Sequence, residues 1–243
     1  MIVNTNKIFS IPTVEVDVQK NKFYLPQSSI NVPVCQHFLV NRYFEPNTHE
    51  LIKEILKKKP GNIIHAGTFF GDMLPSFSKA CGKNKVYAFE PILENFFLSK
   101  KVIEVNLISN VFLFCAALSE ELNLVKMKTS ENNISLGGGS KISDTGDETV
   151  CTICIDQLGI ENLSCIQLDV EGHELPALKG AINTIKEYKP IILIEDYSIS
   201  SDGLVVNEKI CNEFLLSIDY VFVKRIPGLS LWKYKKENLF TSA

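Results

Sequence analysis

The strongest constraint on the fold is an alternation, after residue 60, of short apolar runs rich in β-branched residues with segments of helical periodicity. The runs are bounded by glycine, proline or charge, which suits strands covered by helices on both faces. Strands that alternate with helices form βαβ units and a parallel sheet. The candidate strands are Asn62–Ala66, Lys85–Phe89, Val111–Ala116, Cys165–Val170 and Ile191–Glu195. The pattern predicts an α/β fold.

Four segments have the apolar spacing of helices that pack on such a sheet. They are Thr48–Lys59, Asp72–Cys81, Leu93–Ile108 and His173–Tyr188. Asn47 and Glu50 resemble a capping box that opens the first of these helices. In the third helix, the residues expected to face the core are Phe96, Phe97, Ile103 and Leu107.

The two ends of the chain differ from this pattern. Near the C-terminus, Tyr220–Lys224 and Leu229–Tyr234 are β runs joined by a short turn, which predicts an antiparallel hairpin and one reversed strand in the sheet. The first 46 residues contain an alternating run, Thr13–Val18, and a proline-containing stretch. We therefore expect an N-terminal extension or cap over residues 1–46 and the main domain over residues 47–243.

Composition excludes several classes of protein. The chain is 45% hydrophobic and 22% charged with a formal net charge of −3, which is typical of a globular domain and argues against a nucleic-acid binder. No apolar run approaches the roughly 20 residues that span a bilayer, so no membrane partner is expected. The seven scattered cysteines and the absence of a signal-like start favour reduced thiols and a cytoplasmic location. Cys151 and Cys154 would point to opposite faces of a strand, which disfavours a zinc or redox site.

The first candidate site feature is a glycine turn after the strand Asn62–Ala66. Gly67 and Gly71 are separated by three residues and a helix follows, so the chain can turn sharply and approach a ligand closely. Ligands of open α/β sheets bind beyond the carboxyl ends of the strands, where this turn lies.

The second feature is an acid, Glu90, at the end of the next strand, about twenty residues after the glycines. A carboxylate there can accept hydrogen bonds from both hydroxyls of a ribose.

The third feature is the loop after Cys165–Val170, which carries Asp169, Glu171, His173 and Glu174. Asp169 lies at the strand end, where a site is expected, whereas Glu174 suits a helix N-terminus and is interpreted as structural. The role of His173, in the site or at the helix start, is left open by its position.

These residues, in this order, resemble the FkbM-type methyltransferases, a branch of the class I S-adenosylmethionine-dependent enzymes. The resemblance covers about residues 60 to 235 and is carried by Ile64–Gly71, by Tyr87–Pro91 followed by Asn95, and by Leu168–Leu175 with Leu178–Ala181. It implies a Rossmann-like, doubly wound sheet of seven strands, mostly parallel, with an antiparallel strand in the C-terminal hairpin.

The resemblance also implies a cofactor, S-adenosyl-L-methionine, and a set of residues that bind it. The turn from Gly67 to Gly71 would cradle its methionine part, Glu90 would hold its ribose, and the segment after the third strand would line its adenine. Asp169 would lie beside the methyl group and the acceptor. The expected cofactor-binding residues are His65, Gly67, Thr68, Phe69, Phe70, Gly71, Asp72, Glu90, Pro91, Asn95, Ala116, Ala117, Leu118 and Asp169.

One position departs from the family pattern. Members usually carry Asp or Glu where this chain has His65, and that acid commonly helps to recognise the amino group of the cofactor. A neutral imidazole could accept one hydrogen bond there, whereas an imidazolium would repel the amino group. Asp72, at the following helix start, could compensate for the missing acid.

The resemblance implies methylation of a hydroxyl, with a sugar, a glycan or another small metabolite as acceptor. The expected catalytic residues are Asp169 and His173, either of which would take the proton. No resident metal is expected, although Asp169, Glu195 and Asp196 could supply oxygen ligands in a metal-dependent variant. Two other functions remain as alternatives: a catalytically silent cofactor-binding protein and a nicotinamide-dependent oxidoreductase. The sequence leaves the acceptor and the oligomeric state open.

Overall fold

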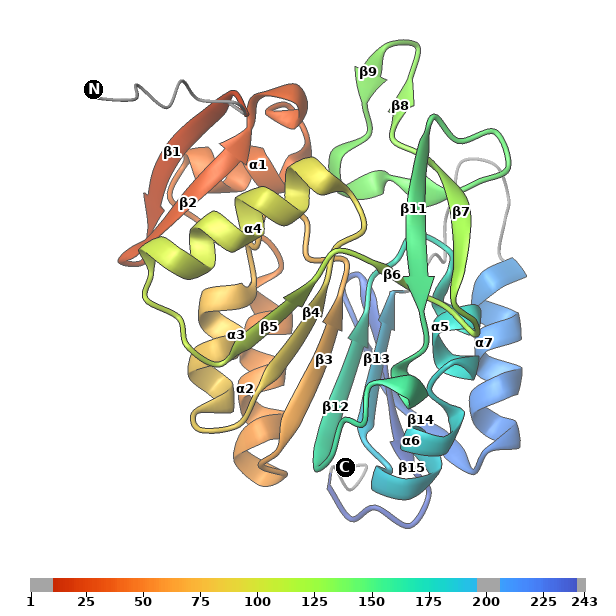
Figure 1. Ribbon diagram of the computed structural model, residues 1–243. Helices are drawn as coiled ribbons and strands as arrows, with labels where there is room; N and C mark the ends of the chain where they lie inside the picture. Colours follow the sequence, from red (N-terminus) through yellow and green to blue (C-terminus); the bar gives the residue numbers. More distant parts are fainter. Residues whose placement is uncertain (1–10, 196–205, 240–243) are drawn as a thin grey trace, which may run out of the picture.

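The computed structural model describes residues 11–195 and 206–239. Its centre is a sheet of seven strands in the order β5–β4–β3–β12–β13–β15–β14 (Figure 1). The strands are β3 (Asn62–Ala66), β4 (Val86–Phe89), β5 (Val111–Phe114), β12 (Leu163–Leu168), β13 (Ile191–Glu195), β14 (Tyr220–Ile226) and β15 (Leu229–Tyr234). The predicted seven-stranded Rossmann-like sheet is confirmed.

The direction of the strands also agrees with the prediction. β5, β4, β3, β12 and β13 are parallel, and β15 is antiparallel to both β13 and β14. The chain winds outward from β3 in one direction through β4 and β5, and from β12 in the other direction through β13. The neighbouring strands β3 and β12 therefore define the topological switch point, beyond which such sheets bind their ligands.

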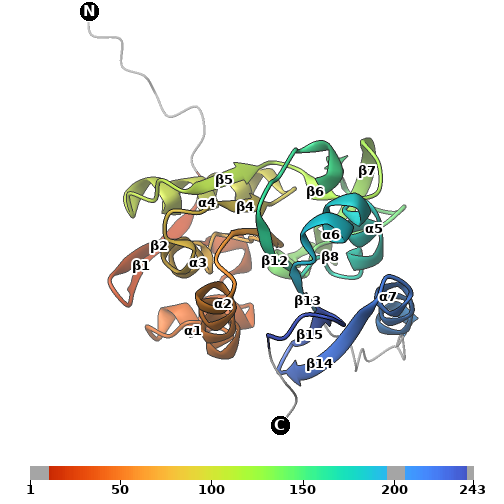
Figure 2. The same cartoon turned by 90° about the horizontal axis from the view of Figure 1, so that it is seen from below.

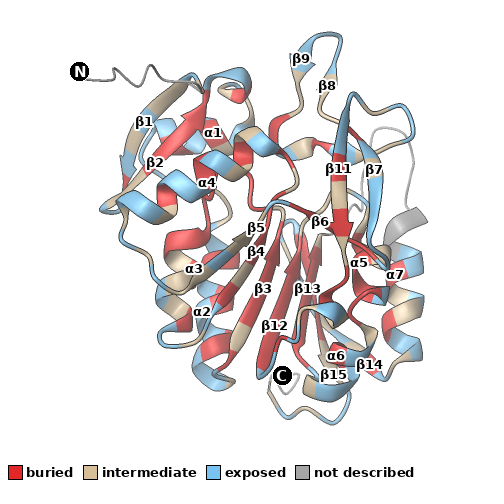
Figure 3. Ribbon diagram, in the orientation of Figure 1, coloured by how far each residue is buried: buried red, intermediate tan, exposed pale blue. Residues whose placement is uncertain are grey.

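Helices cover both faces of this sheet because successive strand residues point to opposite sides (Figures 2 and 3). α2 (Pro46–Lys58) and α3 (Leu74–Cys81) pack with one buried cluster, which contains Ile63 and Cys165. α5 (Glu174–Lys179), α6 (Ile182–Tyr188) and α7 (Val206–Ser217) lie on the other face, whose buried cluster contains Ile64 and Ile166. Adjacent residues of one strand thus belong to opposite cores.

The predicted helix His173–Tyr188 is wrong, because the structure divides it into α5 and α6. The break lies at Gly180, where a Cβ would come 1.9 Å from the carbonyl oxygen of Ser119. Asp156, in the 3-10 helix η3 (Ile155–Gln157), accepts hydrogen bonds from the backbone N–H groups of Asn183 and Thr184 and so caps the start of α6. α5 therefore ends where Gly180 approaches the segment of Ser119, a tertiary contact that the apolar spacing of the sequence does not encode.

The predicted core face of α4 (Leu93–Val105) is right only in part: Ile103 packs against the buried cluster of α2 and α3, as expected, but two of the other residues do not face the core. Phe97 is 41% exposed and Leu107 is 89% exposed, whereas the buried residues of the helix are Asn95, Leu98, Ser99 and Val102. These four share one helical face. That face meets the N-terminal segment and the glycine turn, so polar Asn95 and Ser99 are buried by tertiary contacts that an apolar count does not register.

The N-terminal segment forms a hairpin of β1 (Thr13–Val18) and β2 (Asn21–Pro26), followed by η1 (Gln27–Ser29) and α1 (Pro33–Leu39). It packs on α4 through a cluster that includes Phe23, Phe38 and Phe70. The division of the chain at residue 46 stays a prediction.

The predicted capping box of Asn47 and Glu50 is wrong, because α2 starts at Pro46, directly after Glu45. The Glu45 carboxylate accepts a hydrogen bond from the Thr48 hydroxyl at 3.0 Å.

A second, smaller sheet was not predicted. Its four strands have the order β10–β7–β11–β6, and a short hairpin, β8–β9, adjoins it. The strands are β6 (Ala117–Leu118), β7 (Asn123–Lys128), β8 (Ser130–Glu131), β9 (Ile134–Ser135), β10 (Lys141–Ile142) and β11 (Glu148–Ile153). The Gly137–Gly139 segment forms the 3-10 helix η2. In Figure 1 this layer and the N-terminal hairpin both lie beyond the carboxyl ends of the central strands.

The seven cysteines are all thiols. Five are buried, Cys151 is half-buried and Cys115 is exposed. Of the helices in the described ranges, none combines the length and the apolar character needed to cross a membrane.

Candidate functional site

A cavity of about 420 Å³ lies at the carboxyl ends of β3, β4, β12 and β13, at the switch point of the sheet. The N-terminal segment and η2 meet above it. The hydroxyls of Ser29 and Ser135 lie 3.0 Å apart, and a Cβ on Gly137 would come 2.9 Å from the Cβ of Ser29. The two layers that cover the strand ends are therefore in direct contact, and the cavity lies beneath them.

The glycine turn forms one wall of the cavity. Gly67 has φ +87°, and a Cβ there would come 1.8 Å from the backbone oxygen of Asp169, so no other residue fits without displacing the β12 loop. Phe69 also has a positive φ, +49°, and its ring lines the cavity next to η2. Gly71, with φ +87°, lies against Ser99 of α4.

Glu90 is fixed at the end of β4 by the backbone of this turn. Its carboxylate accepts a hydrogen bond from the N–H of Phe69 at 2.8 Å and another from the N–H of Ile92 at 3.0 Å. Burial raises the pKa of Glu90 to about 7, and these hydrogen bonds and Asn95 oppose the rise. A carboxylate has about four acceptor sites, and the two N–H groups and Asn95 occupy three of them. Glu90 therefore keeps acceptor capacity for a hydroxyl group of a ligand.

The surroundings of Glu90 are apolar. Residues of β4 and β6 and of the loops that follow β4 and β5, together with Met127 of β7, line this part of the cavity; they are Phe89, Pro91, Ile92, Ala116, Ala117, Leu118 and Met127. We call these residues and Glu90 the β4 end of the cavity. Small and flexible apolar side chains around one hydrogen-bonded acid suit a flat apolar ring attached to a sugar.

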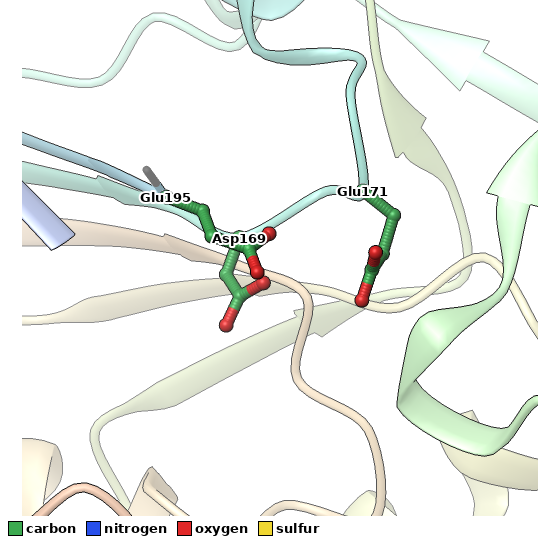
Figure 4. Close-up of side chains that lie close together, drawn as sticks. All are labelled: Asp169, Glu171 and Glu195. Carbon is green, nitrogen blue, oxygen red and sulfur yellow. The ribbon is translucent and has the colours of Figure 1, made fainter. Parts of the chain in front are cut away.

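The opposite end of the cavity is acidic. It contains five carboxylates, which we call the acidic end: Glu45, Asp72, Asp169, Glu171 and Glu195. Figure 4 shows three of them, Asp169, Glu171 and Glu195, gathered at the ends of β12 and β13, and oxygen atoms of these three lie within 4.8 Å of one another. No lysine or arginine is among the described residues that line the cavity.

Burial and repulsion by neighbouring carboxylates shift the pKa values of Asp72 and Asp169 upward. Burial, with Glu45 and Asp169 nearby, raises the pKa of Asp72 to about 8. Burial also raises the pKa of Asp169 to about 7, and a hydrogen bond with Glu195 opposes the rise. Buried carboxylates that lack a cationic partner bind protons near neutral pH. The acidic end is therefore suited to a ligand that brings positive charge.

His65 lies on β3 beside Gln167 of β12, its register partner. Its Nδ1 is hydrogen bonded to Oε1 of Gln167, while its Nε2 has no partner in the described structure. His65 is 1% exposed and lines the cavity, and its ring contacts Phe77 edge-on. Burial lowers the pKa of His65 to about 4, so the imidazole is neutral at physiological pH.

His173 lies at the start of α5 and lines the cavity. Its Nε2 is 3.1 Å from the hydroxyl of Ser119, and burial lowers its pKa. Glu174, interpreted from the sequence as structural, accepts hydrogen bonds from the N–H groups of Val170 and Gly172 and so holds the loop that carries Asp169.

The structure brings most of the predicted site residues together. Those that line the cavity are His65, Gly67, Phe69, Asp72, Glu90, Pro91, Asn95, Ala116, Ala117, Leu118, Asp169 and His173. Thr68, Phe70 and Gly71 do not line it. The Thr68 hydroxyl donates to the carbonyl of Phe89, Phe70 packs on Phe38, and Gly71 lies against Ser99, so these three residues shape the turn. Asp196, named for the metal-dependent alternative, lies outside the described residues.

Among the residues that sequence reasoning missed, three contribute polar groups or a flexible side chain to the site or its support. Glu45 precedes α2 and has a left-handed backbone, Met127 comes from the unpredicted sheet, and Gln167 is buried beneath the acidic end. Gln167 alone carried a signal. It is a polar residue in a strand whose six residues are all buried, where an amide needs a specific partner.

A doubly wound sheet with a cavity at its switch point defines a Rossmann-like cofactor-binding protein. The family model for the methyltransferase FkbM domain matches residues 65–222. The chain belongs to this family of S-adenosylmethionine-dependent methyltransferases. No curated protein matches the sequence.

Solved structures show the same fold. Methyltransferase FkbM from Methylobacillus flagellatus KT is 20% identical with a TM-score of 0.53, and the match covers 72% of this chain but 44% of that protein. The S-adenosylhomocysteine-bound Podospora anserina methyltransferase PaMTH1 is 10% identical with a TM-score of 0.50, covering 86% of this chain and 85% of that one. Cofactor-bound Rv0187 from MTB is 8% identical with a TM-score of 0.50, covering 80% and 82%.

The residues present fit S-adenosylmethionine. The position of Gly67 leaves no room for a Cβ, Glu90 offers a carboxylate acceptor among apolar residues, and the acidic end suits a cationic amino-acid moiety. The nicotinamide-dependent alternative is set aside, because the chain belongs to a methyltransferase family and the ring of Phe69 lines the turn where a pyrophosphate would need open backbone N–H groups.

Proposed function

We propose that the protein transfers a methyl group from S-adenosylmethionine to a hydroxyl of a small metabolite, such as a sugar or a glycan residue. The observation that carries this proposal is the position of Asp169. Its carboxylate lies in the cavity at the end of β12, and burial raises its pKa to about 7. A general base works best when its pKa is close to the operating pH. The compartment stays a prediction.

Positioning supplies most of the rate enhancement in this proposal. When bound, the cofactor provides an electrophilic methyl group on a positively charged sulfur. Alignment of the two reactants can contribute about 7–11 kcal/mol, whereas a base contributes roughly 10²- to 10⁴-fold. Glu90 and the glycine turn would fix the donor, and the covering layers, through Val32, Phe44 and η2, would hold the acceptor and exclude water.

Asp169 would take the proton of the acceptor hydroxyl, and the carboxyl of Glu195 would share it through the hydrogen bond between the two groups. His173 is the second candidate for this role. Its lowered pKa leaves the ring neutral and able to accept a proton, and its contact with the Ser119 hydroxyl orients it.

The test is labelled-methyl transfer to a panel of hydroxyl-bearing sugars and metabolites, with Asp169→Asn and His173→Ala as variants. We expect one of the two to lower kcat about 10²- to 10⁴-fold while S-adenosylhomocysteine still binds. Full turnover in both variants would show that neither residue is the base.

A silent cofactor-binding protein is the second candidate, and the observation that favours it is His65 at the position where the family usually has an acid. This candidate predicts a thermal shift with S-adenosylmethionine but no methyl transfer to any member of the panel.

A further inference from the structure

The pair formed by His65 and Gln167 has two properties that are unusual for buried polar side chains. The two residues are 1% and 0% exposed, and each satisfies only part of its hydrogen-bonding capacity. Nδ1 of His65 contacts Oε1 of Gln167, whereas Nε2 of His65 has no partner in the described structure. A buried polar atom without a partner is costly, so it indicates a missing ligand or a functional role.

The contact with Gln167 decides which ring nitrogen of His65 carries the hydrogen. An amide oxygen can only accept, so Nδ1 of His65 must carry the proton that it donates to Oε1. A neutral imidazole has one N–H, so Nε2 is left with a lone pair and no hydrogen. Gln167 thereby selects the tautomer in which Nε2 is a hydrogen-bond acceptor.

The position of His65 defines what this acceptor can meet. His65 lines the cavity beside Gly67, and the acidic end supplies Asp72 and Glu45 to the same space. A carboxylate ligand would be repelled there, whereas an ammonium group would donate to Nε2 and be attracted by the acids. Of the two charged groups at the methionyl end of the cofactor, only the ammonium suits this place.

We propose that Gln167 is a positioning residue, which holds His65 in its neutral Nδ1–H tautomer so that Nε2 accepts a hydrogen bond from the ammonium group of the bound cofactor. The proposal rests on the cofactor of the methyltransferase family and assigns a function to Gln167. It also explains how a histidine can replace the usual acid: Nε2 of the imidazole carries no hydrogen and so acts as an acceptor, as a carboxylate oxygen would.

Two variants of Gln167 separate this role from a packing role. Gln167→Met keeps the volume but removes the acceptor of the Nδ1–H, so His65 is free to adopt the other tautomer. Gln167→Glu places a carboxylate beside Nδ1, which favours the doubly protonated imidazolium, and the proton on Nε2 then faces the ammonium group. The matched control is Ser164→Ala, also buried on β12 but outside the cavity.

Binding of S-adenosylhomocysteine is measured by calorimetry at several pH values. We expect Kd to rise about tenfold in Gln167→Met and to stay unchanged in Ser164→Ala. In Gln167→Glu, affinity should fall steeply relative to the wild type as the pH is lowered from about 8 to about 6. The other titratable groups around the pair are His49 of α2, Glu45, Asp72, Asp169 and Glu195. The wild type and all variants share these groups, so their effects cancel in the ratio of variant Kd to wild-type Kd at each pH.

Nitrogen NMR of the histidine rings provides a readout that does not depend on activity. The His65 signal should be that of the neutral Nδ1–H tautomer in the wild type, with and without S-adenosylhomocysteine, and should change in Gln167→Met. A wild-type His65 that carries its proton on Nε2, or variants that bind the compound as the wild type does, would overturn the proposal. Failure of the wild type to bind the compound would overturn the cofactor assignment as well.

Discussion

The β4 end and the acidic end of the cavity are built in different ways. At the β4 end, Glu90 is held by two backbone N–H groups from the glycine turn and from its own loop, so geometry is set by neighbouring main chain. At the acidic end, the five carboxylates come from four separate segments of the chain, and the described residues that line the cavity include no lysine or arginine. The β4 end should therefore respond to changes in backbone and hydrogen bonding, and the acidic end to changes in charge and pH.

The largest effect is expected at the turn that joins the two ends. Gly67→Ala should destabilise the protein by more than about 3 kcal/mol, because the new Cβ would meet the backbone of Asp169 in a conformation that is already strained for alanine. Chemical denaturation measures this loss. Gly159→Ala is the control, since Gly159 also has a positive φ but has nothing within 4 Å of its Cβ position. Equal losses at both positions would show that the close approach contributes nothing.

The next effect tests the β4 end. Glu90→Gln should weaken binding of S-adenosylhomocysteine by about 2 kcal/mol, or roughly 30-fold, because an amide nitrogen would face one of the two buried N–H groups. The weakening should be nearly independent of pH above about pH 8, where Glu90 is ionised. Calorimetry that finds wild-type affinity in this variant would refute the role of Glu90.

Asp72→Asn tests the acidic end. Since the pKa of Asp72 is raised to about 8, its carboxyl is mostly protonated at low pH, and binding of a cation must then expel the proton. The ratio of wild-type to variant affinity for S-adenosylmethionine should therefore increase as the pH rises from about 6 to about 9, to a value of roughly ten. A pH-independent ratio of one would remove Asp72 from the recognition of the cofactor.

The smallest effect concerns the support of the turn. The Ser99 hydroxyl donates to the carbonyl of Phe69 at 2.7 Å. Ser99→Ala should lower the free energy of unfolding by about 1 kcal/mol and leave the pH dependence of cofactor binding unchanged. Thermal denaturation measures the loss of stability. A changed pH dependence of cofactor binding would mean that Ser99 influences the acidic end.

The same contrast explains what could be predicted from the sequence. The parallel strands, the C-terminal hairpin, the glycine turn and Glu90 were predictable because local patterns encode them: buried β-branched runs, glycines in a turn, and an acid directly after a strand. The sheet of seven strands and the role of Ala116–Leu118 were implied by the family resemblance, and Met127 was missed. The second sheet was not predictable, since β7 is largely exposed and is held by antiparallel pairing with β11 rather than by an apolar face. Glu45 was missed because its place in the acidic end depends on how the N-terminal segment packs, and the break at Gly180 because it depends on contact with Ser119.

The central claim is that one cavity holds a nucleoside at its β4 end and a cationic amino-acid moiety at its acidic end. The direct test compares S-adenosylhomocysteine with methylthioadenosine, which keeps the nucleoside and lacks the amino acid. We predict that calorimetry finds both compounds bound by the wild type, with S-adenosylhomocysteine at least about tenfold tighter, and that Asp72→Asn weakens only S-adenosylhomocysteine. Equal affinities of the wild type for the two compounds would contradict the assignment of the acidic end.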